Sequence, residues 1–378
     1  MDFSYTEEQL ALKDTLQRFV ARDYGFEHRR ALSGSPLGYS ADAWRRYAEL
    51  GLLALPFPEA FGGLGGGGID VMVVMEIVGQ GLLLEPYLST VVLCGGLIRD
   101  AASEAMKSAL LPAIAAGRVR IALAAYEAAG RYDLAHVACH AEPHAGGWHL
   151  SGRKTVVLDA PSADYLLVSA RTGGNVAEAQ GISLFLVPRD AARLTLSAYP
   201  TQSGGRAADV ELREVQVGTD SVIGMPGQAL GIIERAVDVG AAALCAEALG
   251  IVAALNDATL NYLKTRKQFG VPIGNFQALQ HRMADMFIAA EQLRSMAIIA
   301  AVHADSRDAA ERRRVISGAK AYVGQAARFV GQKAVQLHGA MGVVDALIVS
   351  HYFKRLTMID MSFGDADFHL ARFSDMMR

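Results

Sequence analysis

Cysteine is scarce in this sequence of 378 residues, and the few cysteines follow no paired or metal-binding spacing. Cys94, Cys139 and Cys245 lie far apart among apolar neighbours. Disulfide frameworks and zinc sites use cysteines at short, repeated spacings, so we predict buried free thiols in a reducing compartment. The sequence predicts no metal site.

An excess of one charge is also missing. Lysine and arginine number 36 against 39 aspartates and glutamates, which gives a formal net charge of −3. Because nucleic-acid-binding proteins usually carry a clear basic excess, we expect no nucleic-acid partner. The first residues lack the features of a signal peptide, and no apolar run reaches the roughly 18 uncharged residues of a membrane span. We therefore expect a cytoplasmic protein without a membrane segment.

Apolar residues are abundant, at 52% of the chain, and they follow a helical period near the N-terminus. Residues 1–118 are predicted to form an all-helical domain. Thr6 and Gln9 are spaced as a capping box, and further helices are expected at 41–50, 71–80, 87–98 and 104–116. The glycine cluster at 61–68 has no Gly-Lys-Ser/Thr sequence and follows no strand, which favours a surface loop over a phosphate-binding loop.

The hydrophobic period shortens towards two between residues 119 and 224. Turn residues separate six strand candidates, at 121–125, 136–141, 148–158, 165–169, 182–187 and 210–217. This spacing predicts a small central β domain of barrel or sandwich type.

Residues 225–378 are predicted to be helical again. Three apolar stripes step by three and four residues: Leu244, Ala248, Ile251, Leu255, Thr259 and Tyr262; Phe276, Leu279, Met283, Met286, Ala290 and Leu293; and Ile316, Ala319, Val323, Ala326, Val330, Ala334 and Leu337. Helices striped in this way pack as an antiparallel bundle, here predicted to be a four-helix bundle. The fold class is therefore α+β, in the order α, β, α.

The turn between the first two stripes carries an unusual group of side chains. Gly270, Pro272 and Gly274 punctuate it, and Asn275 is placed to cap the next helix. Spacing alone fits an ordinary capped helix pair. However, Arg266 brings a planar donor fork close to an aromatic ring and side-chain amides, which suits a phosphate-bearing cofactor.

Two motifs, Arg266-x-Gln268-Phe269-Gly270 and Gln336-Leu-His-Gly339-Ala-Met-Gly342, together with the domain order resemble the acyl-CoA dehydrogenase family along essentially the whole chain. The resemblance implies FAD as cofactor and an acyl-CoA as substrate, oxidised to the 2,3-enoyl-CoA. A glutamate of the family removes the α-proton, and the β-hydrogen leaves as hydride to the flavin. It also implies a tetramer in which each FAD lies across a subunit interface.

In the family, the C-terminal bundle of a neighbouring subunit holds the ADP end of FAD. The matching positions, which we call the ADP half-site, are Arg266, Gln268, Phe269, Ile273, Phe276, Gln277, Gln336, Leu337, Gly339 and Ala340. Arg266 and Gln336 match the pyrophosphate contacts, and Gly339 matches the residue that lets the backbone approach. His338, between them, is expected to form a wall or hydrogen bond rather than to transfer protons.

The flavin-ring contacts of the family are not kept. The loop at 125–133 lacks the family's threonine, proline and serine, and the aromatic and threonine that meet the ring are replaced by Val156 and Leu158. Neither residue offers a hydroxyl, and Val156 has no π-face.

The catalytic glutamate is missing as well. Its usual position, counted without gaps, falls on Phe363, and its alternative position falls on Gly240, beside Ala241 where the family has an arginine. Neither phenylalanine nor glycine can abstract a proton, so we predict no catalytic residue in this chain.

We therefore predict the small subunit of a heteromeric dehydrogenase, whose large subunit holds the flavin ring, the base and the acyl-CoA. Five stretches resemble small subunits of family members that act on pimeloyl-CoA: 2–9, 131–135, 264–274, 352–360 and 363–367. This resemblance implies a dicarboxylyl-CoA substrate such as pimeloyl-CoA. Two alternatives remain open. The chain could be a self-sufficient homotetramer with Asp365 as a relocated base, although Asp365 also fits a helix N-cap. It could instead be a non-catalytic binding or regulatory protein of the same fold.

Overall fold

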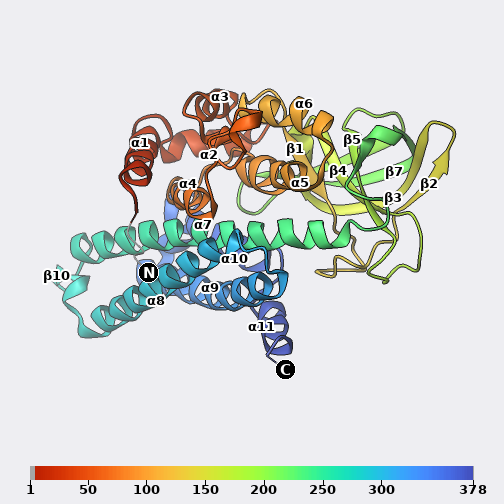
Figure 1. The fold of residues 1–378 in the computed structure, drawn as a ribbon. Coiled ribbons are helices and arrows are strands. Elements are labelled where there is room, and N and C mark those ends of the chain that lie inside the picture. Colours follow the sequence, from red (N-terminus) through yellow and green to blue (C-terminus); the bar gives the residue numbers. More distant parts are fainter. Residues whose placement is uncertain (1–4, 378) are drawn as a thin grey trace. The chain divides into compact units, whose positions relative to one another are not determined.

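The computed structural model describes residues 5–377 and follows the predicted order of helices, sheet and helices (Figure 1). The likeness stretch that begins at Asp2 therefore lies partly outside the described residues. The N-terminal helices are α1 Glu7–Asp23, α2 Phe26–Gly34, α3 Ala41–Glu49, α4 Gly68–Gly81, α5 Gly96–Ala101 and α6 Glu104–Ala115, with a π-helical segment η3 Leu88–Gly95 and short 3₁₀ turns η1 Leu52–Ala54 and η2 Glu59–Phe61.

Local signals located most of these helices. The predicted capping box is present, because the Thr6 hydroxyl accepts from the Gln9 backbone N–H and the Gln9 side chain accepts from the Thr6 N–H. Helix α2 was not predicted, since its polar sequence carries no clear apolar stripe. The helix expected at 87–98 is wound partly as a π-helix, a distinction that apolar spacing does not make.

The central strands form one eight-stranded sheet in the order β6-β7-β3-β2-β4-β5-β8, with β1 paired parallel to β4. Their bounds are β1 Ile121–Ala124, β2 His140–His144, β3 Gly147–Leu158, β4 Tyr165–Arg171, β5 Ile182–Pro188, β6 Leu194–Pro200, β7 Arg206–Gly218 and β8 Val222–Ile223, with η4 Ala160–Ser162 and η5 Thr219–Ser221 between strands. The strand expected at 136–141 begins only at His140, because the N–H groups of Ala138 and Cys139 donate to the Glu127 carboxylate instead of to a neighbouring strand.

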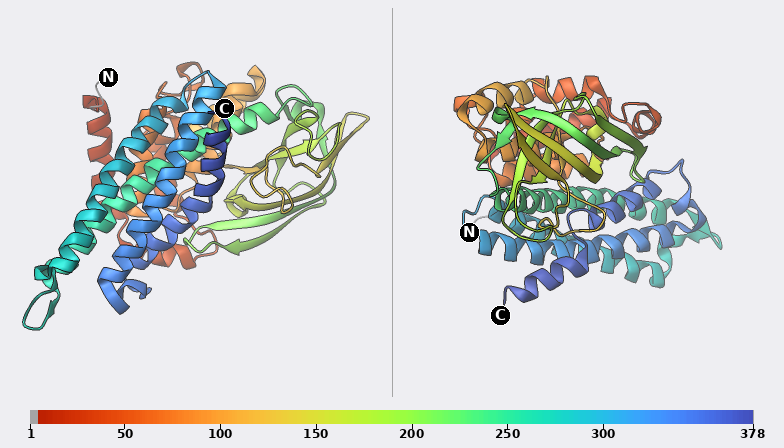
Figure 2. Two further views of the ribbon diagram at one scale, coloured as in Figure 1. Left: turned by 90° about the horizontal axis from the view of Figure 1, so that it is seen from below. Right: turned by 90° about the vertical axis from the view of Figure 1, so that its right-hand side faces the viewer.

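The C-terminal helices are α7 Leu230–Thr265, α8 Gln277–Ala304, α9 Ala309–His338, α10 Ile348–Met361 and α11 Ala366–Asp375. The predicted stripe of α9 is buried throughout, from Ile316 at 0% exposure to Leu337 at 5%. Helix α9 packs along α8, and α10 and α11 pack on α9 (Figure 2). By length and composition α7 and α8 are apolar enough to cross a membrane, but 89% of the apolar window of α7 is buried, as in the core helix of a soluble protein; the figure for α8 is 33%.

Glycine allows α4 and α7 to approach closely. A Cβ at Gly250 would lie 1.8 Å from the backbone oxygen of Glu76, and one at Gly79 would lie 2.0 Å from that of Glu247. The buried Glu247 side chain forms a two-pronged ion pair with Arg355 at 2.5 and 2.7 Å. Glu247 therefore has a structural partner inside the helical core.

The chain divides into two compact units that do not follow the sequence order of the regions. One unit comprises Met1–Ala31, Gly67–Leu83 and Ala241–Arg378, and the other comprises Leu32–Gly66 and Leu84–Gly240. The first contains most of the long helices and the second contains the sheet.

Candidate functional site

A β-hairpin, rather than a simple turn, connects α7 with α8. Strands β9 Lys267–Gln268 and β10 Val271–Pro272 pair antiparallel, and the N–H of Ile273 donates to the Arg266 carbonyl at 2.8 Å. Figure 1 shows this hairpin at the far end of the two helices. Phe269 and Gly270 make the reversal, both at positive φ (53° and 82°).

The prediction that Asn275 caps α8 is wrong. Asn275 ends the 3₁₀ turn η6 Ile273–Asn275, and the N-cap position belongs to Phe276, whose side chain makes no capping hydrogen bond. The tight turn places Phe276 rather than Asn275 at the start of the helix, because the Phe276 N–H donates to the Ile273 carbonyl.

The predicted cofactor residues of this hairpin are presented to solvent. Arg266, Gln268 and Gln277 are exposed, and the Phe269 ring is 92% exposed. The Phe269 ring stands edge-on to Phe276, with centroids 6.1 Å apart and an interplanar angle of 87°. The hairpin thus offers a donor fork, two amides and an aromatic surface at one edge of the unit; Ile273, behind them, is partly buried.

The second predicted motif forms the end of α9. Gln336 faces solvent, whereas Leu337 is 5% exposed and belongs to the core. Gly339 ends the helix at φ 60° and ψ −140°, and nothing lies within 4 Å of where its Cβ would be. This conformation is essentially restricted to glycine, and it leaves the backbone open to a ligand. Ala340, also exposed, lies in the following turn η7 Gly339–Val343.

Stacking of Tyr262 on His338 brings the two motifs together. The ring centroids are 4.5 Å apart and the planes are inclined by 25°. Tyr262 lies one helical turn before Arg266, and His338 lies between Gln336 and Gly339. Burial lowers the pKa of His338 despite the hydrogen bond between its Nδ1 and the Ala334 carbonyl. The predicted ADP half-site is therefore gathered at one end of the helical unit.

The β domain contains a separate cavity of about 500 Å³. At its base Lys154, with 0% exposure, donates to the Glu127 carboxylate at 2.7 Å and to the Ser169 hydroxyl at 2.9 Å. Burial pushes the pKa of Glu127 upward. The Lys154 charge, and the hydrogen bonds that the Glu127 carboxylate accepts, hold that pKa below its usual value. Sequence reasoning missed this pair, because 27 residues separate its members.

The two positions predicted to meet the flavin ring, Val156 and Leu158, are not among the residues that line this cavity. Val156 has φ 51° and is 53% exposed, and its N–H donates to Asp209 at 3.1 Å. Asp209, which lines the cavity with Glu211, also accepts from the Tyr199 hydroxyl. Leu158 pairs with Ala207 in the sheet. The ring edge of a flavin consists mostly of hydrogen-bond acceptors, so the aliphatic side chains of Val156 and Leu158 do not replace the family's hydroxyl and aromatic groups at these two positions.

Phe363, at the position of the family's catalytic glutamate, lies in a tight turn and carries no carboxylate. Phe363 has φ 61° and is 9% exposed, and Gly364 has φ 113°. The buried Lys320 ammonium group donates to the carbonyls of Asp360 and Gly364, at 2.9 and 2.8 Å, on either side of Phe363. At the alternative position, Gly240 and Ala241 lie within α7.

Asp365 acts as a helix cap. Its Oδ1 accepts from the N–H of Phe368 at 2.9 Å at the start of α11. This contact is the N-cap that the sequence suggested as the ordinary role of the residue.

Comparison with known proteins identifies the family of this chain. Three domain models of the acyl-CoA dehydrogenase family match the chain. The N-terminal domain matches residues 6–118, the middle domain residues 122–217 and the C-terminal domain residues 228–375. A solved structure of the Tcur3481-Tcur3483 steroid ACAD is 31% identical, covering 98% of both chains, with a TM-score of 0.86. The chain belongs to the acyl-CoA dehydrogenase family.

Other acyl-CoA dehydrogenases match over nearly their full length. The probable acyl-CoA dehydrogenase YngJ of Bacillus subtilis is 27% identical over 97% of both chains. A chain of the ChsE4-ChsE5 complex from Mycobacterium tuberculosis is 26% identical, with a TM-score of 0.90 and coverage of 100% and 99%. An FAD-dependent dehydrogenase, 25% identical, is also among the matching structures. The acyl-CoA dehydrogenase fold and the FAD dependence of the family, whose members oxidise CH–CH groups, are thus confirmed.

Proposed function

We propose that this chain is the small subunit of a heteromeric, FAD-dependent acyl-CoA dehydrogenase that forms 2,3-enoyl-CoA. It supplies the ADP half-site, and a large subunit supplies the flavin-ring contacts, the catalytic glutamate and the acyl-CoA site. The observation that carries the proposal is a contrast within the chain: the two motifs predicted to bind the ADP end lie together at one end of the helical unit, whereas Val156, Leu158 and Phe363 stand where the family has its flavin-ring contacts and its base.

The chemistry of the ADP half-site fits a dinucleotide. Arg266 is the group for the pyrophosphate, because a guanidinium presents two parallel donors to phosphate oxygens. The Gln336 amide adds a donor, and the open backbone at Gly339 permits close approach. Gln268 and Gln277 add amides, while Phe269, Ile273, Phe276, Leu337 and Ala340 form walls. FAD bound there would supply the hydride acceptor.

High exposure of the half-site explains why a partner is needed. A side chain such as Phe269, 92% exposed, gains little by touching a ligand that remains in water. Binding pockets usually bury most of a ligand's surface. A second subunit would supply the remaining walls, and the ChsE4-ChsE5 and Tcur3481-Tcur3483 structures show that the family includes complexes of two different chains.

A self-sufficient enzyme is the weaker account. Asp365 already accepts a capping hydrogen bond at 2.9 Å, and the Phe363 position holds no titratable group. A base must reach the proton that it removes, and it must be free to accept it. We therefore assign proton abstraction to the large subunit.

The substrate class rests on sequence likeness. That likeness favours a dicarboxylyl-CoA such as pimeloyl-CoA, whereas one of the similar solved structures is a steroid acyl-CoA dehydrogenase. If the large subunit holds the acyl group of the substrate, the residues of the small subunit need not determine the substrate specificity. A panel of pimeloyl-CoA, a plain fatty acyl-CoA and a steroid side-chain CoA, assayed with the complex, would identify the class.

The test is co-expression with the large-subunit gene product and measurement of FAD dissociation from the purified complex. We expect Arg266→Ala to weaken FAD binding at least tenfold, and Arg266→Lys to restore it only in part, since lysine keeps the charge but loses the fork. Lys267→Ala on the same exposed hairpin is the matched control and should leave binding unchanged.

Two results would contradict the proposal. The first is a flavin-saturated homo-oligomer of this chain that dehydrogenates acyl-CoAs at ordinary rates. The second is a complex whose FAD affinity stays unchanged when Arg266 or Gln336 is replaced by alanine. If no preparation bound flavin at all, the regulatory alternative would replace it.

A further inference from the structure

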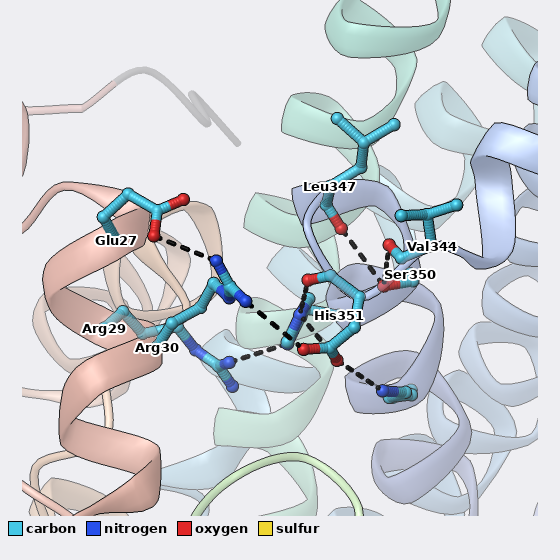
Figure 3. A network of polar contacts seen from close by, with 9 residues as sticks. Glu27, Arg29, Arg30, Val344, Leu347, Ser350 and His351 are labelled. Atoms are coloured by element: carbon cyan, nitrogen blue, oxygen red, sulfur yellow. Dashed lines mark hydrogen bonds and ion pairs between the residues drawn. The ribbon is translucent and has the colours of Figure 1, made fainter.

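A buried arginine in the N-terminal region contacts the start of α10 (Figure 3). Arg29, on α2, has 1% exposure. Its Nη1 lies 2.9 Å from Nδ1 of His351, and its Nε donates to the Leu82 carbonyl at 3.3 Å. All three residues belong to the helical unit. Sequence analysis singled out neither Arg29 nor His351.

The contact with Arg29 determines which ring nitrogen of His351 carries the proton. A guanidinium can only donate, so Nδ1 of His351 must accept and its proton must lie on Nε2. Nε2 is 2.8 Å from the backbone oxygen of Asp345, which is an acceptor. Both ring nitrogens are therefore satisfied only in the neutral, Nε2-protonated form. A second proton on Nδ1 would point at the arginine N–H.

Charged groups surround the ring from each neighbouring element. From α2 come Arg29 and Arg30, the latter paired with Glu27 at 2.9 Å (Figure 3). The Asp345 carboxylate lies 3.3 Å from Nε2 of His351, 3.8 Å from Arg30 and 3.2 Å from Lys354 of α10. Phe26 stands edge-on to the imidazole at 5.0 Å. Arg355, Tyr24 and Tyr352 act on Arg29 from further away.

The same contacts close the segment that follows the nucleotide motif. Residues 339–347 run from Gly339 through η7 to α10, and Asp345 lies within them. His351 holds the Asp345 carbonyl, while the Ser350 hydroxyl donates to the carbonyls of Val344 and Leu347, both at 3.1 Å. The first turn of α10 thus clamps the end of this segment, and Arg29 orients the clamp.

We propose that Arg29 and neutral His351 are positioning residues that hold segment 339–347, and with it the Gly339 edge of the ADP half-site, and that protonation of His351 releases the segment. The consequence for FAD rests on the proposed function. The consequence for the segment does not.

The direction of the pH effect follows from the surroundings. Burial lowers the pKa of His351, and the Arg29 and Lys354 charges lower it further, against the opposing effects of the Asp345 carbonyl and carboxylate. A group with a lowered pKa stays neutral in the folded state at neutral pH. Its contribution is present above about pH 6.5, the ordinary histidine value, and is lost as the pH falls through the folded value.

Hydrogen exchange of the full chain alone tests the clamp. The reporters are the amides of Val344 and Leu347, which donate to the carbonyls of Met341 and Val344. After correction for intrinsic rates, we expect their exchange to rise about tenfold between pH 7.5 and 5.5. His351→Gln should remove this rise, because glutamine offers an acceptor and a donor at similar spacing and does not titrate.

The control is His28→Gln, which replaces an exposed histidine on α2, the helix that carries Arg29, and should leave the pH dependence as in the wild type. Arg29→Met should give fast exchange at both pH values. The proposal is overturned if His351→Gln keeps the wild-type pH dependence, or if wild-type exchange is flat over this range. A flat wild-type profile overturns the proposal even if a variant fails to fold.

Measurement of FAD dissociation from the complex separates the two claims. Loss of FAD at pH 5.5 in the wild type but not in His351→Gln would extend the clamp to the cofactor. A pH-dependent clamp in a complex insensitive to Arg266→Ala would contradict the proposed function and leave the clamp standing.

Discussion

Lys154 is a buried charge whose partners lie inside the β domain. Its ammonium group is fully buried against Glu127 and Ser169. Lys154→Met leaves the Glu127 carboxylate buried without its counter-ion, which should cost about 3–5 kcal/mol of unfolding free energy. Urea denaturation of the purified chain measures this loss.

Arg153→Met is the matched control, since the neighbouring Arg153 side chain is 76% exposed and its ion pair with Glu211 is screened by water. We expect an unchanged urea midpoint. A Lys154→Met protein as stable as the control would show that the pair does not hold this cavity together.

Asp365 allows a direct separation of capping from catalysis. Asp365→Ala removes the hydrogen bond to Phe368 and should destabilise the chain by about 1 kcal/mol, whereas Asp365→Asn keeps a cap. Neither change should affect turnover of the complex. Loss of turnover in a folded Asp365→Asn complex would instead identify Asp365 as a base.

Single residues were predictable where a motif carried them. Arg266 and Gln336 stand in recognisable sequences, and the structure gathers both at one end of the helical unit through Tyr262 and His338. The buried pairs Lys154–Glu127 and Arg29–His351 were not predictable, since each joins residues far apart in sequence. Asn275 was misassigned because helix caps shift by a residue when a 3₁₀ turn precedes them.

At the scale of elements, the approach of α4 to α7 depends on two glycines. Gly250→Ala would put a methyl group 1.8 Å from the Glu76 carbonyl oxygen, so one helix must move. We expect a loss of about 1–3 kcal/mol, read from chemical denaturation.

Gly231→Ala on the same helix is the comparison, because nothing lies within 4 Å of its Cβ position. Alanine there should stabilise the helix by up to about 1 kcal/mol. Equal effects of the two substitutions would mean that helix propensity, and not the close approach, governs Gly250.

Long periodic elements were the predictable ones. The α9 stripe is buried as expected, and so is the α7 stripe from Leu244 to Thr259, because a repeat sustained over many turns admits only one helical face. Tyr262, at the end of the α7 stripe, is only partly buried. Strand β6 was missed, since its residues are largely exposed at the edge of the sheet and carry little apolar signal. The start of β2 was misplaced because Glu127 takes the backbone donors just before it.

At the scale of the whole molecule, buried histidines should make the helical unit acid-sensitive. Burial and the charges of Lys320 and Arg372 lower the pKa of His369 to about 3, against the opposing effect of its hydrogen bond with the Phe363 carbonyl. Below about pH 6.5 the imidazole of His369 binds a proton in the unfolded chain but stays neutral in the folded chain. This one group should therefore lower the free energy of unfolding by about 1.4 kcal/mol for each pH unit.

Thermal unfolding between pH 7 and 5 measures the effect, in a range where most carboxylates remain ionised. His369→Gln keeps a donor for the Phe363 carbonyl, which Nε2 of His369 contacts at 3.1 Å, and should show a shallower decline. An identical decline in wild type and variant would rule out His369 as its source.

The central claim concerns assembly: this chain completes an FAD site whose chemistry belongs to another subunit. Flavin content, measured by absorbance and protein mass on the chain alone and on the complex with its large subunit, tests it most directly. The account predicts a colourless chain alone and one flavin for each pair of unlike chains in an active complex. A yellow homo-oligomer with one flavin in every chain, active on acyl-CoA, would contradict it.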